Sequence, residues 1–288
     1  MKNVDDLVQH LSLEKIDAHN YSGTSQPIGG PNVFGGQVLA QALNAAYKTI
    51  PEERTVHSLH SYFLLPGNLN IPITYNVNEM RNGGSFSTRR VTATQEDRTI
   101  FILAASFHRK EEGYDHQEAM ELELKQPEEL LSWNQMAAQF GDFIPSKLKA
   151  FLGMERPMDF KPVEIPNPIV QEDLPAVEDV WFKLKGDTST LSLPMKQQIL
   201  TYISDYNILR PTLKPHMGKA AHGTVQMASL DHSMWFFRDF DFDDWLLFSS
   251  RSPSTSGARG FATANIFTRD GKLVASLAQE GLLRPKTR

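Results

Sequence analysis

The sequence contains no cysteine, which excludes disulfide bonds, thiolate catalysis and cysteine-ligated metal sites. It also lacks an excess of basic charge. The net charge is −5 and the pI is near 6.0, so we expect no nucleic-acid partner. No apolar run approaches the roughly 20 residues that span a bilayer, and Asp5 and Asp6 interrupt the start, where a signal peptide would be apolar. We therefore expect no membrane insertion and a cytoplasmic location.

The length and composition are those of a globular protein. A chain of 288 residues can form two domains of ordinary size, each with its own core. Hydrophobic residues make up 40% of the chain and charged residues 22%, within the range of soluble proteins. The net negative charge still allows a local basic pocket for a phosphorylated ligand.

The second half of the chain repeats the plan of the first, with corresponding points roughly 168 to 173 residues apart. In each half, a helical pattern is followed by several strand patterns. The first half has a helix from Gly35-Gly36 to just before Pro51, then strands at residues 56–65, 73–80, 86–94 and 99–107. The second half has extended segments at 158–165 and 177–185, a helix at 193–209, and strands at 225–238, 245–250, 260–268 and 273–283. This order predicts an α+β fold made of a duplicated unit.

The region between the two repeats has a different character. Residues 116–156 are rich in Glu and Gln, and they show a helical pattern that breaks near Pro145. We therefore expect an N-terminal unit at 1–115, a partly helical connecting segment at 116–156 and a C-terminal unit at 157–288.

Asp205 is the first candidate for chemistry. On the expected helix it lies at the flank of the apolar stripe, about 40° from Leu209. Partial burial there would raise the pKa of the carboxyl group and make it a better base. A carboxylate at such a boundary can equally serve a structural hydrogen bond, and the pattern alone leaves both interpretations open.

A second cluster, Ser229 to Ser233, resembles a catalytic triad in composition only. Neighbouring strand residues point to opposite faces, so Asp231 and His232 cannot align with Ser233 for a proton relay. We expect Ser229, Asp231 and Ser233 to share one face and His232 to point to the other. Structural hydrogen bonding is the expected role for most of them.

Three further features complete the candidates. The N–H groups of Gly35 and Gly36 at a helix start could stabilise an oxyanion or a phosphate, and close packing explains the glycines equally well. His57 and His60 would face opposite sides of a strand, so we expect no metal site there. Gln279, near the end of a strand of small residues, could orient a water molecule.

Taken together, these motifs resemble the acyl-CoA thioesterase II family. The similar stretches cover nearly the whole chain in order, and the resemblance is weakest between 116 and 156. They are Val33 to Gln37, His57 to Gly67, Ser85 to Val91, Ser204-Asp205, Leu230 to Trp235, Ser256 to Gly260 and Val274 to Gly281.

The resemblance implies a double hotdog: two fused units, each with a long helix wrapped by an antiparallel sheet. It further implies a thioester hydrolase acting on fatty acyl-CoA, without a cofactor, in a homo-oligomer that is a dimer or tetramer. In the family, an Asp, a Ser or Thr and a Gln hold the attacking water, and these match Asp205, Ser229 and Gln279.

The repeat suggests how the two halves divide the work. We take Gln37, His57 and Ser106 as the approximate first-half counterparts of the three residues, and none of them is a carboxylate. We therefore expect one working site per chain. The first half would contribute walls and donors, so Gly35, Gly36, Gln37 and His57 are tentative substrate-binding residues.

Several alternatives stay open at this point. Asp205 could activate water or attack the thioester directly through an anhydride. The chain could instead be a hotdog enoyl-CoA hydratase, although no His accompanies Asp205 on the helix, or a non-catalytic acyl-CoA-binding protein. Contacts to the phosphates of coenzyme A could come from Arg81, Arg89, Arg90 and Arg259.

Overall fold

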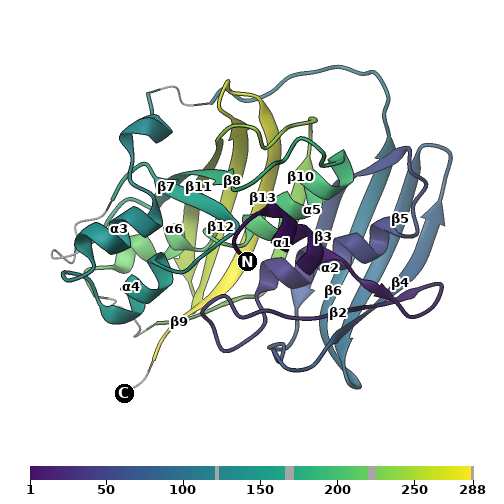
Figure 1. The fold of residues 1–288 in the computed structure, drawn as a ribbon, viewed down its shortest axis with the longest axis horizontal. Helices are drawn as coiled ribbons and strands as arrows, with labels where there is room; N and C mark the ends of the chain where they lie inside the picture. The colour runs from purple at the N-terminus through teal and green to yellow at the C-terminus, as the bar shows by residue number, and fades with distance from the viewer. Residues whose placement is uncertain (121–122, 166–171, 220–224, 287–288) are drawn as a thin grey trace.

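The computed structural model describes residues 1–120, 123–165, 172–219 and 225–286. Two long helices, α2 (Gly35–Tyr47) and α5 (Leu193–Ser204), lie side by side in front of one large antiparallel sheet (Figure 1). A shorter helix, α1 (Val4–Leu11), packs against both of them and buries Val4, Leu7 and Leu11. Within the described part of the chain, no helix has the length and apolar character needed to cross a membrane.

The strand order of the sheet reflects the duplication. It runs β1-β2-β4-β5-β6-β3-β10-β13-β12-β11-β8-β7, so each half has the same internal order, read outward from the central β3–β10 pair. That pair joins the halves in antiparallel register, with His60 opposite Ser233. The first-half strands are β1 (Glu14–Lys15), β2 (Asn20–Gly23), β3 (Arg54–Phe63), β4 (Ile73–Asn82), β5 (Phe86–Gln95) and β6 (Arg98–Arg109). The second-half strands are β7 (Met158–Pro162), β8 (Val177–Leu184), β9 (Val225–Ser229), β10 (Asp231–Phe236), β11 (Leu246–Ser256), β12 (Arg259–Thr268) and β13 (Leu273–Pro285).

The two long helices approach each other closely because α2 is built from small residues. Ala40, Ala42, Ala45 and Ala46 are fully buried. A Cβ on Gly36 would lie 2.3 Å from the Tyr202 carbonyl oxygen, so only glycine allows this approach. Further along, Asn44 Nδ2 donates to Gln198 Oε1 at 2.7 Å. The N-terminus of α2 therefore sits against the C-terminus of α5, at the boundary between the two halves.

Most expected elements form close to their expected positions. The Asp270-Gly271 turn joins β12 to β13 as predicted, with Gly271 at φ +89. β11 extends beyond the expected strand because a register shift between Arg251 and Ser254 accommodates Pro253. Helix α1 was not anticipated. It begins at an Asn3 cap, whose side chain accepts from the Asp6 N–H at 3.0 Å.

Two expected boundaries are wrong, and both lie at the candidate site. The second long helix ends at Ser204 rather than at Leu209, so Asp205 occupies its C-cap. The expected strand at 225–238 is interrupted at Leu230, where β9 ends and β10 begins.

The connecting segment contains short helices, with a break at Pro145. These are η1 (Pro127–Glu129), α3 (Trp133–Phe140) and α4 (Ser146–Leu152), and the short elements α6 (Arg210–Leu213) and η2 (Lys214–His216) follow α5. The division of the chain at residues 115 and 156 stays a prediction.

Candidate active site

Asp205, Ser229 and Gln279 come together at one point although they are far apart in sequence. Asp205 caps α5, Ser229 ends β9, and Gln279 lies within β13. Ser229 Oγ donates to Asp205 Oδ1 at 3.3 Å, and Gln279 Nε2 donates to the same oxygen at 3.1 Å. Gln279 Nε2 also donates to Ser229 Oγ at 2.8 Å. Each of the three side chains therefore contacts the other two.

The pKa of the Asp205 carboxyl group is higher than that of an ordinary aspartate. Burial raises its pKa from 3.8 to about 6, against the opposing effect of hydrogen bonds from Gln279, Ser229 and the Gly36 N–H. The pKa is raised by burial as expected, although Asp205 caps the helix instead of lying on the flank of its apolar stripe. At neutral pH most molecules carry an ionised Asp205, whose carboxylate can accept a proton.

A bulge explains why Ser229 reaches this site. On β13, Gly281 pairs with Ser229 and Ala278 pairs with Ser233. The chain therefore advances four residues from Ser229 to Ser233 while β13 advances only three. The extra residue is Leu230, and it reverses the alternation of side chains between β9 and β10. The expectation that Ser229 shares a face with Asp231 and Ser233 is therefore wrong. Ser229 points to the same side as His232, toward the helices.

Gly35 and Gly36, at the start of α2, lie close to the Asp205 carboxylate. A Cβ on Gly35 would lie 2.6 Å from Asp205 Oδ2 and 2.9 Å from the Phe63 ring. The Gly36 N–H already donates to Asp205. Close packing against α5 therefore explains the glycine at position 36, and the N–H of Gly36 stabilises the carboxylate through a hydrogen bond.

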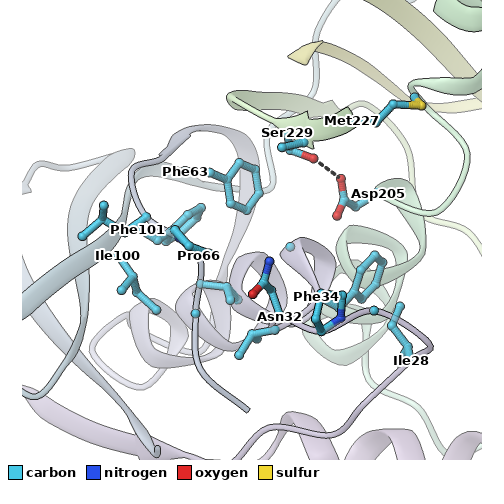
Figure 2. A pocket seen from close by; sticks show the side chains of 18 of the residues that line it. Ile28, Asn32, Phe34, Phe63, Pro66, Ile100, Phe101, Asp205, Met227 and Ser229 are labelled. Atoms are coloured by element: carbon cyan, nitrogen blue, oxygen red, sulfur yellow. Dashed lines mark hydrogen bonds between the residues drawn. The ribbon is translucent and has the colours of Figure 1, made fainter. Parts of the chain in front are cut away.

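A cavity of about 720 Å³ opens beside the three polar residues. Figure 2 shows Asp205 and Ser229 facing each other at one side of it, with Phe34, Phe63, Ile100 and Phe101 spread around the remainder. Its wall also includes Val33, Val38, Leu64, Leu65, Phe151 and Met227. The Asp205 carboxylate thus borders a space suited to an apolar group.

Gln37 and His57 lie away from this cavity. Gln37 is buried, and its side chain bonds to Gln41 of the same helix and to Thr24 and Ser25, which follow β2. His57 bonds to Ser106 Oγ at 2.8 Å and lines a second cavity of about 700 Å³ at the opposite end of the helix pair. The structure therefore gives neither residue a contact with the Asp205 site.

The strand registers also correct the assignment of first-half counterparts. The β3–β6 pair of the first half corresponds to the β10–β13 pair of the second half. His60 pairs with Ala104 in the first pair, and Ser233 pairs with Ala278 in the second. The next residue along, Ala105, is therefore the counterpart of Gln279. By the same register, Val56, which pairs with Phe107, is the counterpart of Ser229, which pairs with Gly281. Lys48 caps α2 as Asp205 caps α5. The earlier assignment to Gln37, His57 and Ser106 is wrong because the two helices and the strands are offset by different amounts.

One of the arginines considered as a coenzyme A contact has a structural role. Arg89 is buried, donates to Thr49 and pairs with Glu79 at 3.1 Å, so it cannot reach a ligand phosphate. Arg81 and Arg90 are exposed, and Arg259 is exposed and pairs with Glu280 at 2.9 Å.

Sequence reasoning missed the contact between His232 and the site. The ring is fully buried and bonds to the side chains of Gln279 and Ser204. Its pKa falls to about 4 because burial disfavours the charged ring. Its place in a buried strand beside Ser229 was the available signal, but the position of Gln279 opposite it depends on the pairing of β10 with β13.

Comparisons with known proteins agree with this architecture. Residues 151–282 match the family model described as acyl-CoA thioesterase, and residues 22–108 match the acyl-CoA thioesterase N-terminal domain. An acyl-CoA thioesterase 2 from Haemophilus influenzae is 39% identical, covering 98% of both chains. The human acyl-coenzyme A thioesterase 8 is 36% identical over 96% of this chain and 88% of its own length.

Solved structures show the same fold. An acyl-CoA thioesterase II from Mycobacterium marinum superposes with a TM-score of 0.78 at 33% identity, over 97% of this chain and 99% of its own. A hotdog-fold protein from Alicyclobacillus acidocaldarius reaches a TM-score of 0.75 at 17% identity, over 96% of this chain and 97% of its own, which supports the fold alone. The expected α+β double hotdog is confirmed, and the chain belongs to the acyl-CoA thioesterase family.

Proposed function

We propose that this chain hydrolyses fatty acyl-CoA thioesters to a free fatty acid and coenzyme A. The observation that supports this most is the triangle of Asp205, Ser229 and Gln279 beside an apolar cavity. A base with a pKa of about 6 is ionised at neutral pH, and the apolar wall suits an acyl chain.

In the proposed reaction, a water molecule binds between Asp205 and the two donors, Ser229 and Gln279. Asp205 accepts a proton from this water while the oxygen attacks the thioester carbonyl. The resulting tetrahedral intermediate collapses, and the carbon–sulfur bond breaks. The proton held by Asp205 then passes to the departing thiolate, which leaves as coenzyme A.

The negative charge on the intermediate needs a donor close to the cavity. Gly35 is the first residue of α2, and the first N–H groups of a helix have no hydrogen-bond partner within the helix. The N–H of Gly36 is directed to Asp205. We therefore assign the oxyanion role to the Gly35 N–H alone.

Direct attack by Asp205, through an anhydride, is the competing route. A single turnover in water labelled with heavy oxygen distinguishes the two. Water attack places the label in the fatty acid only, whereas hydrolysis of an anhydride at the enzyme carbonyl places the label in the Asp205 carboxylate.

The first test is release of free thiol from acyl-CoAs of short to long chain length, by the wild type and Asp205→Asn. We expect the wild type to hydrolyse part of the panel and the variant to lose that activity. Asp231→Asn is the matched control. Asp231 is also half-buried and has a raised pKa, mainly from burial, but it bonds to the Glu280 N–H outside the triangle.

Other results would favour a different function. If the wild type released no thiol but hydrated an α,β-unsaturated acyl-CoA, the chain would be a hydratase. Binding of acyl-CoA without either reaction would identify a non-catalytic binder.

We also propose a cytoplasmic homo-oligomer, a dimer or tetramer, organised as the units 1–115 and 157–288 with the connecting segment 116–156. The aromatic side chains Tyr62 and Trp235, 57% and 36% exposed, lie on the central strands β3 and β10 and support burial of the outer sheet face against another copy. Sedimentation of the wild type and of a Tyr62→Lys variant tests this. A monomeric wild type would refute it.

A further inference from the structure

His232 joins the end of α5 to Gln279 through both of its ring nitrogens. Nδ1 contacts Gln279 Oε1, and Nε2 lies 3.0 Å from Ser204 Oγ. The ring and Ser204 are both fully buried. Ser204 immediately precedes Asp205, so the connection forms a closed circuit from Asp205 through Ser204, His232 and Gln279 back to Asp205.

The proton positions in this circuit follow from what each atom can donate. The ionised Asp205 carboxylate only accepts, so Gln279 must present its amide NH₂ to it. Gln279 Oε1 then faces His232 and also only accepts, so Nδ1 must carry a proton. In a neutral ring, Nε2 is then an acceptor. The Ser204 hydroxyl therefore donates to Nε2 rather than to the Thr201 carbonyl, which it approaches at 2.8 Å.

The opposite arrangement would disable the site. If the Gln279 amide turned over, its carbonyl oxygen would face the Asp205 carboxylate, and two acceptors would lie in contact. The same turn would remove the amide donor from Ser229. A protonated Nδ1 on His232 prevents this, because it stabilises only the orientation that points the NH₂ group toward the site.

We propose that His232 is a positioning residue that fixes the orientation of the Gln279 amide and thereby sets the proton affinity of Asp205. This inference rests on the proposed role of Asp205 as the base. The ring keeps its neutral form over the working range because its pKa, lowered by burial, lies near 4. Tyr206, which also faces Asp205, stays uncharged there because burial raises its pKa.

The test compares two substitutions of nearly equal shape. His232→Leu removes the donor, whereas His232→Asn keeps an N–H donor near the position of Nδ1. For His232→Leu we expect kcat to fall about ten- to a hundredfold with KM nearly unchanged, by analogy with the loss of hydrogen-bond partners that orient the ligands of a metal site. His232→Asn should restore most of the lost kcat.

The pH profile supplies a readout that a purely structural role would not change. The bond from Gln279 lowers the pKa of Asp205, so losing the oriented amide raises it. The acid limb of kcat/KM should therefore move to higher pH in His232→Leu and return toward the wild-type position in His232→Asn. His60→Leu is the control, because His60 lies on the neighbouring strand, is exposed and bonds to Ser233. It should leave both kinetics and profile unchanged.

A His232→Leu variant with wild-type kcat and acid limb would overturn the positioning role, as would a His232→Asn variant as impaired as His232→Leu. If His232→Leu does not fold, Ser204→Ala replaces it. That variant frees the ring to take the other tautomer and should lower kcat with the same upward shift of the limb, and a wild-type profile there would overturn the proposal. Activity that survives in Asp205→Asn would instead refute the proposed role of Asp205 as the base, and a wild type that releases no thiol would refute the proposed function itself.

Discussion

Lowering the pH through 6 should switch off hydrolysis by protonating a single carboxyl group, Asp205. The pKa of this group is about 6 because burial disfavours its charge more than its three hydrogen bonds favour it. The protonated form cannot accept a proton from water, so activity is present above pH 6 and is lost as the pH falls. An ordinary aspartate would keep its activity down to about pH 4.

The expected size of the change follows from the titration of one group. With a pKa of about 6, about ten molecules in eleven carry an ionised Asp205 at pH 7, and about one in eleven does at pH 5. Between these two pH values kcat/KM should therefore fall about tenfold, with a limiting slope of one.

The assay measures kcat/KM from pH 4.5 to 8 in buffers of constant ionic strength. Aliquots are stopped at fixed times, and free thiol is determined at a common pH, because thiol reagents depend on pH themselves. Rates of Asp205→Asn are subtracted as background. An acid limb centred near pH 4 would refute the reasoning, since it would mean that burial does not govern the carboxyl group.

Three further predictions follow from the same site. Gly35→Ala places a Cβ 2.6 Å from Asp205 Oδ2 and should lower kcat at least about tenfold, whereas Gly84→Ala, with no atom within 4 Å, should be neutral in the same assay. Ser229→Ala removes a donor to Asp205 and should reduce kcat about tenfold, while Ser229→Thr keeps the hydroxyl and most of the activity. Because the folded-state pKa of Asp205 is raised, its ionisation costs stability as the pH rises from 3.8 to about 6. Asp205→Asn should therefore stabilise the fold at pH 7 by about 1 kcal/mol after allowing for solvent screening, seen as a melting temperature about 2 °C higher; an unchanged or lower value would contradict this.

Local patterns predicted the elements well because each signal lies within one segment. Small residues on one helix, alternating strands and the Asp270-Gly271 turn all form where the sequence placed them. The family resemblance also selected three side chains that meet in space, Asp205, Ser229 and Gln279. Their catalytic roles stay a proposal.

The errors occur where pairing between distant segments decides the outcome. The bulge at Leu230 depends on how β9 and β10 pair with β13, and it reversed the predicted face of Ser229. The contact of His232 with Gln279 depends on the same register. No window of the sequence around either residue contains that information.

The unequal ends of the α2–α5 pair have an evolutionary consequence. Two identical single units would be related by symmetry, so every substitution would change both ends at once. A fused chain removes this restraint. One end carries Asp205, Ser229 and Gln279, while the register gives the other end Lys48, Val56 and Ala105. Under the proposed mechanism, selection for turnover acts on one end only, and the residues around Lys48 are free to drift or to acquire a different use.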